Sequence, residues 1–385
     1  MSVPTYQQYL LALSNHTTNY SVRLQLCDKY GNVTGELTNL LENSNGSITR
    51  NLQNGSRASI TVSLINDKLQ HSISPDSIWM GQMFQLQIGV EIANGEIFWV
   101  QQGWFCLTNP TITSNFSERR IEFSAVDKFA NLDGTLGGVL SNTYIIPTTV
   151  VNLTTAIKSI LIEAGDPISP IIDAVFDSVV IPYTITKQYG SNYGELLQEL
   201  ASFASANIGY TDFGQFFFQQ GSQDIPDNTK PTQQLLGVTE VNYMGASSIF
   251  QFDKIFNSIL IIGDNVNGNL ASAKATNDNL LSPTRVQLIG EKLKVIEDSI
   301  IPDDTFALSR ANWELKRLNM IQSLTSIKCA PLPHLRENIV VSLTDPALGY
   351  ENERFLIQSL NYPNYIGGIM ELSVVNVNEL SFNNI

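Results

Sequence analysis

Cysteine is scarce in this chain of 385 residues. Only Cys27, Cys106 and Cys329 occur, they lie far apart, and no two of them form a Cys-x-x-Cys pair. An odd number of distant cysteines does not build a disulfide framework. The sequence therefore predicts a protein without structural disulfides that is made in a reducing compartment.

Charged residues are also few, and positive charge is the rarer kind. Charged side chains make up 15% of the chain, and 22 basic residues stand against 36 acidic ones, for a net charge of −14. A protein that binds a phosphate backbone needs an excess of Lys and Arg, so the net charge argues against that class. A protein that DNA passes without sticking is not excluded. So low a charged fraction favours a chain that buries part of its surface in an assembly.

Long hydrophobic runs are missing. The longest, near residues 255–262, has the length of a strand and is far short of the ~20 residues that span a bilayer. Residues 1–14 lack the basic start and the small-residue cleavage site of a signal peptide. We therefore expect neither secretion nor stable membrane insertion.

Histidine is rare, and catalytic motifs are missing. His16, His71 and His334 stand alone, without an HExxH or a Cys/His cluster around them. There is no GxSxG, P-loop or GxGxxG pattern either. The sequence predicts no catalytic residue, no metal ligand, no cofactor-binding residue and no enzyme activity. Carboxylates brought together only by folding remain possible at this point.

Three acidic stretches imitate functional motifs. Residues 212–214 (Asp-Phe-Gly) copy a kinase triplet without its companions, so we interpret them as a hairpin turn. Residues 264–268 resemble a calcium loop, but their glycine comes one residue early and no Glu closes the loop. Asp303 and Asp304 precede a helical pattern, and a helix cap explains them better than acid–base chemistry.

The first 135 residues predict an antiparallel β domain. A short helix over residues 5–14 precedes stretches in which apolar and polar residues alternate with the period of a half-buried strand. An Asn-Gly turn at residues 93–96 indicates a hairpin. The alternating stretches are residues 22–26, 60–64, 84–90, 97–107 and 121–125.

A small α/β domain is expected over residues 136–235. Glycine-rich breakers between residues 127 and 140 separate it from the first domain. Two helices are predicted, at residues 153–164 and 189–206, followed by a hairpin over residues 208–219. Residues 221–231, with two prolines and little apolar content, are interpreted as a linker.

The last predicted domain, residues 236–385, combines strands with one amphipathic helix over residues 304–321. Apolar residues recur at three and four positions along this helix, and the residues on its opposite face are polar. The apolar set is Phe306, Ala307, Ala311, Leu315, Leu318 and Ile321, and the polar set is Arg310, Glu314, Lys316 and Arg317. Strands are expected at residues 257–263, 323–330, 338–343, 353–360 and 369–377. The pattern favours a barrel or sandwich with the helix packed on its outside.

Aromatic residues on strands are the best candidates for contacts with a partner. Trp99 and Trp104 are placed in the first domain, and residues 216–218 are three consecutive phenylalanines. Core packing is the default for such rings, but neighbouring positions of a strand face opposite sides, so one Phe ring has to leave the hairpin's own core. Tyr362, Tyr365 and Ile366 flank Pro363 and are expected at an exposed tip.

The order and spacing of these features resemble the tail hub, or baseplate hub, of tailed bacteriophages and contractile injection machines. The resemblance runs over roughly residues 20–377 and has no single diagnostic motif. The stretches that carry it are residues 59–64, 76–78, Gly103-Trp104-Phe105, 121–127, 132–133, 193–206, 208–216, 257–259, 282–283, 304–318, 331–333, 338–343, 354–360 and 369–377.

The resemblance implies a fold and a function. It implies a mainly β, α+β protein in which a small α/β domain separates two tail-tube-like antiparallel β-barrel domains, the second with the added helix. Three copies would close a ring at the tail tip, assembled in the bacterial host cytoplasm. The ring would join the tail tube and distal tail protein to the tape measure protein and the tip or spike proteins. It would line the DNA channel without binding DNA specifically, and an acidic lumen suits that role.

Another reading stays open. A receptor- or carbohydrate-binding protein of the same tail tip would expose an aromatic groove around Trp99, Trp104 or Tyr362. Many hub proteins continue into a cell-wall hydrolase or a receptor-binding extension, whereas this sequence stops at Ile385, soon after its last predicted strand. Wall digestion or receptor binding is therefore expected to belong to another protein.

Overall fold

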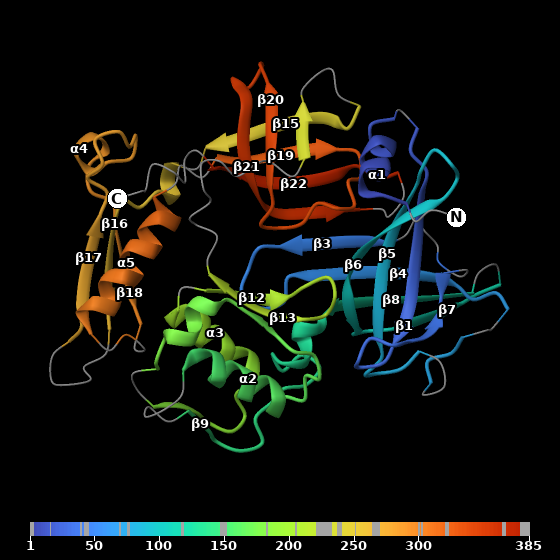
Figure 1. The fold of residues 1–385 in the computed structure, drawn as a ribbon, viewed down its shortest axis with the longest axis horizontal. Helices are drawn as coiled ribbons and strands as arrows, with labels where there is room; N and C mark the ends of the chain where they lie inside the picture. The colour runs from blue at the N-terminus through green and yellow to red at the C-terminus, as the bar shows by residue number, and fades with distance from the viewer. Residues whose placement is uncertain are drawn as a thin grey trace.

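Two β units, a middle α/β unit and a small inserted unit make up the computed structural model (Figure 1). The strands of both β units belong to one 14-stranded sheet, with the order β15-β19-β22-β21-β3-β4-β8-β6-β5-β1-β2 along its main path. The structure describes residues 4–15, 17–38, 41, 46–68, 71–74, 78–116, 119–146, 152–181, 184–204, 206–220, 233–236, 241–250, 252–263, 270–298, 301, 303–319, 323–363 and 367–377.

The first β unit follows the alternation of its sequence. In β4, for example, Ile60, Val62 and Leu64 point into the core, and β4 pairs antiparallel with β8. Helix α1 (Tyr6–Leu13) begins at a capping box, in which Thr5 and Gln8 bond each other's backbone N–H. The strands are β1 (Tyr20–Cys27), β2 (Val33–Glu36), β3 (Ser47–Asn51), β4 (Ala58–Ile65), β5 (Met83–Glu91), β6 (Ile97–Leu107), β7 (Thr111–Ser114) and β8 (Arg119–Asp127).

The second β unit is joined to the first by a strand pairing that the sequence does not predict. Residues 359–362, at the end of β21, pair antiparallel with residues 48–51 of β3. One hydrophobic core then runs through both units, from Ile60 and Phe84 to Ile327 and Val374. The strands are β14 (Gln233–Leu236), β15 (Tyr243–Phe250), β19 (Ser323–Cys329), β20 (Val340–Asp345), β21 (Tyr350–Tyr362) and β22 (Met370–Asn376).

The middle unit has its own core. Helices α2 (Leu153–Glu163) and α3 (Tyr193–Phe203) pack with the hairpin β12–β13 around Phe216 and Phe218. Helix α3 begins four residues later than predicted, because the Asn192 side chain accepts the Glu195 N–H at 2.7 Å and sets the start. The other elements are η3 (Lys128–Asn131), β9 (Tyr144–Ile146), β10 (Ile171–Ile172), η4 (Ala174–Ser178), β11 (Ile185–Lys187), β12 (Ala206–Tyr210) and β13 (Phe216–Gln220).

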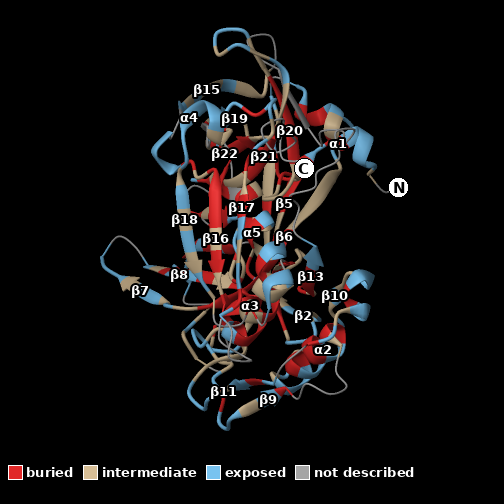
Figure 2. Cartoon of the chain, turned by 90° about the vertical axis from the view of Figure 1, so that its left-hand side faces the viewer, coloured by how far each residue is buried: buried red, intermediate tan, exposed pale blue. Residues whose placement is uncertain are grey.

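The amphipathic helix α5 (Asp304–Leu318) belongs to an inserted unit rather than to the outside of the second β unit. It covers one face of a three-stranded sheet of order β17-β16-β18, where Ile259 and Ile261 meet Ala307 and Ala311. Figure 2 shows the contrast between buried residues on β16 and exposed ones on β18. The other elements are η5 (Phe252–Lys254), β16 (Ser258–Ile262), β17 (Ser272–Thr276), α4 (Val286–Ile289) and β18 (Leu293–Glu297).

Helix α5 also corrects one predicted face. Glu314 was expected on the solvent side, yet it is 2% exposed and pairs with Arg310 at 2.8 Å. Arg310 donates to the Ser202 carbonyl at 2.7 Å, and Phe306 stacks on Phe203 with ring centroids 5.3 Å apart. Arg310 of the polar set and Phe306 of the apolar set therefore dock α5 on the end of α3, which a helix pattern alone does not reveal.

The predicted fold class is confirmed: the protein is mainly β, of the α+β class, with an α/β unit between two antiparallel β units. Within the part of the chain that is described, the strands form open sheets and no closed barrel. The physical reason is the shared pairing of β3 with β21, which continues the sheet from one unit into the next.

Candidate functional site

The hairpin turn predicted at residues 212–214 is present, and its aspartate is the centre of an ion-pair junction. Asp212 accepts from Arg50 of β3 at 2.8 Å and from Arg336, in the loop before β20, at 2.6 Å. Arg336 also donates to the Pro333 carbonyl at 2.6 Å. One carboxylate of the middle unit thus binds arginines from both β units.

The electrostatics of this junction are those of a closed ion pair. Burial alone would raise the pKa of Asp212, but the charges and hydrogen bonds of Arg336 and Arg50 lower it below its ordinary value. Burial opposes the charge of Arg50, whose pKa is nevertheless raised by Asp212 and Glu337. Such mutual stabilisation suits a structural clamp, because Asp212 and Arg50 both keep their charges.

A second set of buried polar groups lies beside the junction. The Asp127 carboxylate accepts the backbone N–H of Arg57 and of Ala58, and burial raises its pKa. The Arg57 guanidinium donates to the Ile208 carbonyl at 3.1 Å and lies over the Phe217 ring at 4.7 Å. As predicted, one ring of the Phe triplet contacts a residue outside its own unit.

A cavity lies between the first β unit and the middle unit. It has a volume of about 440 Å³ and is bordered by Lys29, Met80, Cys106 and Leu136 among others. At its base, Lys128 pairs with Asp166 at 2.6 Å. A cavity of this size with a few convergent polar groups is the usual form of a binding site.

The polar base of this cavity is internally paired. Tyr210 donates from its hydroxyl to Asp166 at 2.6 Å, and Lys128 donates to the Gly214 carbonyl at 3.2 Å. Burial and the Asp166 charge raise the pKa of Tyr210 well above its ordinary value. Burial also raises the pKa of Cys106 to about 11, so this thiol stays protonated and a poor nucleophile at neutral pH.

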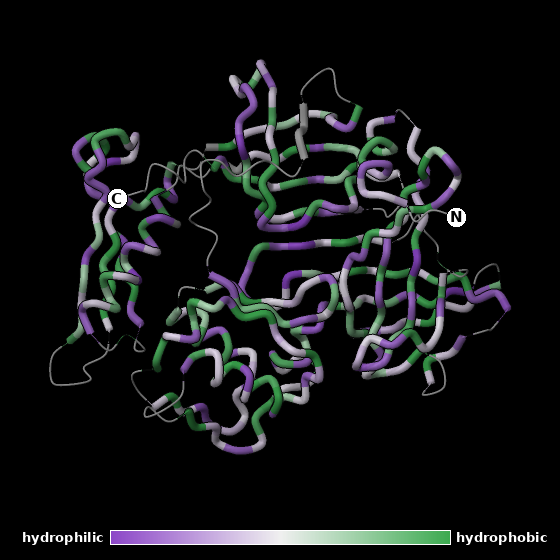
Figure 3. Tube along the Cα trace, in the orientation of Figure 1, coloured by the Kyte–Doolittle hydropathy of each residue, from purple (hydrophilic) through white to green (hydrophobic). Residues whose placement is uncertain are grey.

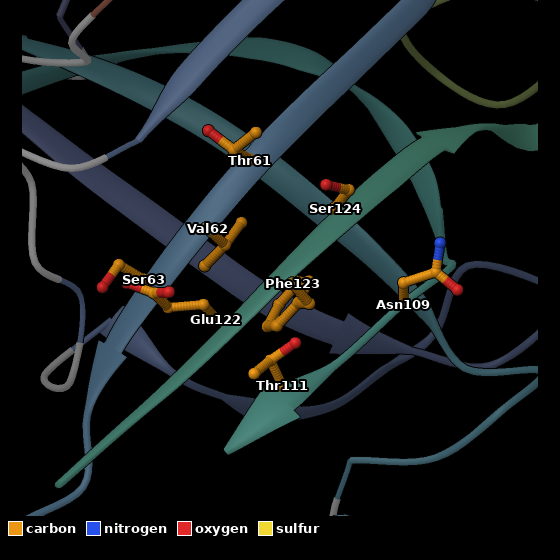
Figure 4. Close-up of a pocket in the computed structure, with 8 residues that line it drawn as sticks. All are labelled: Thr61, Val62, Ser63, Asn109, Thr111, Glu122, Phe123 and Ser124. Carbon is orange, nitrogen blue, oxygen red and sulfur yellow. The ribbon is translucent and has the colours of Figure 1, made fainter. Parts of the chain in front are cut away.

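A second hollow, of about 330 Å³, lies on the strands β4, β7 and β8 (Figure 4). Its lining is mostly hydroxyl and amide, with one carboxylate, Glu122, which pairs with Arg120 at 3.3 Å. Hydrogen bonding is the chemistry it offers, since its lining contains no His, Cys or second carboxylate. The lining residues are Thr61, Val62, Ser63, Asn109, Thr111, Glu122, Phe123 and Ser124.

The predicted aromatic groove is not assembled. Trp104 is 8% exposed and Tyr362 1% exposed, so the expectation that Tyr362 lies at an exposed tip is wrong. Tyr362 alternates into the shared core, because its strand β21 pairs with β3. Trp99 lies under the Arg23 guanidinium, 4.1 Å from the ring centroid. Tyr365 and Ile366 lie outside the described residues.

The remaining predicted sites have structural roles where they are described. Asp303 caps α5 by accepting the N–H groups of Thr305 and Phe306 at 2.9 and 3.0 Å, as expected. Among the described residues, no three His, Cys, Asp or Glu side chains gather as a metal site. Residues 221–231, residues 264–268, His16 and Ile321 lie outside the description, as does the Arg317 side chain.

Sequence reasoning missed the Asp212 junction. Its members are isolated charges far apart in the chain, and nothing in their spacing brings them together. One signal was available in β3, where strand alternation puts Arg50 on the same buried face as Ile48. A charge on a core-facing position requires a buried partner.

None of the helices in the described part of the chain has the length and hydrophobicity to cross a bilayer. The sequence matches no known protein-family profile, and it matches no curated protein. The fold, however, is that of prophage tail proteins. One solved example is the 43 kDa tail protein of prophage MuSo2 from Shewanella oneidensis, with a TM-score of 0.65 and 18% identity, which matches over 94% of this chain and 99% of that one.

Two other solved structures share the fold. The tail protein from Neisseria meningitidis MC58 has a TM-score of 0.66 and 11% identity, over 95% of this chain and 99% of that one. A chain of the Francisella PdpA–VgrG complex has a TM-score of 0.55 and 11% identity, over 94% of this chain and 53% of that one. At such identities the similarity is one of fold, and it agrees with the resemblance to tail hubs.

Proposed function

We propose that this chain is a structural protein of a phage-like tail, in which it forms the hub ring at the tail tip or baseplate. The observation that carries the proposal is the extent of the structural match. Two prophage tail proteins correspond to 94–95% of this chain and to 99% of their own length. The likeness therefore covers the whole arrangement of units and not one common module.

The proposed ring is a homotrimer, and each chain divides at residues 1–135, 136–235 and 236–385, with the inserted unit lying within the last of these ranges. It connects the tail tube and distal tail protein to the tape measure protein and to tip or spike proteins. The PdpA–VgrG complex supports a tip partner, since one of its chains has this fold. DNA passes through without specific binding, which the net charge of −14 favours.

The Asp212 junction supports a load-carrying role. Ion pairs from one side chain to two β units hold the middle unit in a fixed orientation, and rigid units suit a ring that must keep its channel open. In this proposal the chain is not an enzyme. The receptor-binding alternative is disfavoured, because Trp104 and Tyr362, two of the three rings it relies on, are buried.

Light scattering measures the solution mass of the protein, and negative-stain images of the same peak show the shape of the particle. Together they test the proposal. We expect a species of three times the 42.6 kDa of one chain, imaged as a ring with an open centre. A strictly monomeric protein at high concentration, also in the presence of a distal tail protein, would contradict the ring. A monomer that binds cell-wall glycans would favour the receptor-binding alternative.

A further inference from the structure

A loop of the inserted unit exposes two neighbouring leucines. Leu280 is 77% and Leu281 is 80% exposed, and Leu288 and Ile289 of α4 add further exposed apolar surface. Figure 3 shows hydrophobic residues on this loop, at the outer end of the inserted unit. Contiguous exposed apolar side chains on an ordered surface mark an interaction site.

A buried polar network holds this leucine loop in shape. Asn277 donates to the hydroxyls of Ser282 and Thr284 at 2.7 and 3.2 Å, and Asn257 donates to the Gly290 carbonyl at 2.8 Å. Asn257 and Asn277 have no exposed surface. Since these bonds fix the loop without a partner, binding through it costs little ordering entropy.

The cavity above the Lys128–Asp166 pair has the complementary chemistry. Its volume of about 440 Å³ lies in the range that takes a drug-sized ligand, and two leucine side chains are smaller than that. Methionine side chains in a wall adapt their shape to an inserted apolar group. The apolar wall residues are Met80, Met83, Leu132, Leu136 and Pro167.

The polar groups at the base of the cavity do not disfavour the insertion of an apolar side chain. The Lys128 ammonium and the Asp166 carboxylate pair at 2.6 Å, and Tyr210 donates to the same carboxylate at 2.6 Å. Because these groups already bond one another, an apolar side chain entering above them leaves no charge newly unpaired.

A charged residue at the rim of the cavity and one beside the leucine loop are opposite in sign. Lys29 is exposed at the rim of the cavity, where its ammonium lies 5.2 Å from the Tyr30 ring centroid. Asp278 is exposed two residues before Leu280, and its carboxylate accepts from the neutral Gln287 side chain at 2.9 Å. An Asp278–Lys29 contact at the rim of the leucine pair would orient the docking and speed it.

We propose that Leu280 and Leu281 of one copy insert into this cavity of the next copy, with Asp278 facing Lys29. The inference rests on the ring proposed above and identifies its contact between copies. Loop and cavity are different surfaces: Figure 1 places α4 at one end of the molecule, away from α2 and β1, whose ends border the cavity. Contact between two different surfaces is head-to-tail, and such contacts form a ring where the rotation from copy to copy closes.

Oligomer dissociation of a loop variant tests this contact. Leu280→Asp with Leu281→Asp changes only exposed side chains, so the monomer should keep its circular dichroism and melting temperature. We expect the dissociation constant, from light scattering over a dilution series, to rise on the order of thirtyfold or more. Leu11→Asp on α1, where the leucine is 67% exposed and does not border the cavity, is the matched control. An unchanged dissociation constant of the loop variant would overturn the contact.

Cross-linking gives a second, independent readout. A Leu281→Cys chain mixed with a Met80→Cys chain should form a disulfide between the two under mild oxidant, whereas neither chain alone should cross-link. Both chains carry Cys106→Ser, because this native thiol borders the cavity, whereas the buried Cys27 and Cys329 do not compete. Absence of the mixed product in a preparation that forms rings would refute the contact and leave the ring intact. A wild-type monomer would instead refute the proposed function.

Discussion

A single side chain, Asp212, connects three parts of the molecule. Its carboxylate bonds the nearly buried Arg50 and the arginine of the loop before β20. Removing one member of a buried ion pair leaves the others without compensation, which costs more than the pair itself contributes. The sequence predicts a turn aspartate here and the structure confirms the turn, but the contribution of Asp212 to stability comes from partners outside the turn.

We predict that Asp212→Asn lowers the free energy of unfolding by about 2–3 kcal/mol, because two arginines lose their counter-charge while the shape is kept. Urea unfolding followed by circular dichroism measures the change. Glu351→Gln removes one carboxylate from an exposed position of β21 and serves as the control, with an expected effect within about 0.5 kcal/mol. Equal effects of the two substitutions would show that the junction does not stabilise the fold.

His334 makes stability depend on pH. Burial lowers its pKa to about 4, and the Tyr9 hydroxyl lies 2.8 Å from its Nδ1 atom. The unfolded chain therefore binds a proton on this histidine at a higher pH than the folded chain does. The contribution is complete above the unfolded pKa near 6.5 and is lost as pH falls towards 4.

We predict that the wild-type protein loses on the order of 3 kcal/mol between pH 7 and pH 4 through His334, and that His334→Gln removes this part of the slope. Urea unfolding across that pH range, with both proteins in parallel, separates the histidine from carboxylates that act in the same direction. Parallel curves for the two proteins would contradict the assignment.

At the scale of elements, two turns from different units enclose the Trp104 ring. A Cβ atom on Gly31 would lie 1.8 Å from the ring, and one on Gly214 would lie 2.5 Å from it. Both glycines have positive φ, at +88° and +71°. Gly31 follows β1, and Gly214 belongs to the hairpin of the middle unit, so the ring links the two units by packing alone.

We predict that Gly31→Ala destabilises the protein by about 1–3 kcal/mol more than Gly190→Ala does. The two glycines share a φ of +88°, but a Cβ on Gly190 meets no atom within 4 Å, so the control isolates the backbone cost, about 1–2 kcal/mol. Thermal unfolding of both variants gives the comparison. Equal destabilisation would mean that Trp104 moves aside freely.

The starts of the helices show which element boundaries are set by residues adjacent in the sequence. Asp303, Asn152 and Thr5 each cap a helix through their own side chains, and the predicted starts at these positions agree with the structure. The start of α3 was misplaced at residue 189, since the apolar stripe extends the pattern but the Asn192 cap decides where the helix begins. Capping is local chemistry, so boundaries of this kind are readable from sequence.

At the scale of the whole molecule, the units differ in how far they depend on one another. One core is shared by both β units, whereas the middle unit encloses its own, from Phe129 to Phe218. The pairing of residues 48–51 with residues 359–362 also gives β3 a neighbour from the far end of the chain. Losing that neighbour leaves an open strand edge, which promotes aggregation.

We predict that a fragment of residues 127–220 folds alone with a cooperative thermal transition, because its core is complete. A fragment of residues 1–126 should lack such a transition or aggregate, since it loses half of a shared core and the partner of β3. Circular dichroism melting and gel filtration of both fragments test whether each one folds cooperatively and stays soluble. A soluble, cooperatively melting N-terminal fragment would contradict the shared-core account.

The sequence by itself determined the elements and the class of the fold. Strand alternation, helix stripes and caps are local patterns, so the β units, α2, α5 and the hairpin after α3 were predictable, as was the likeness to tail hubs. Only the tertiary structure decided the rest: the β3–β21 pairing, the separate sheet under α5, the burial of Tyr362 and the arginines around Asp212. Apart from the sheet under α5, whose segments are nearer in the chain, these features join residues a hundred or more positions apart. No local pattern records which distant partner folding will supply.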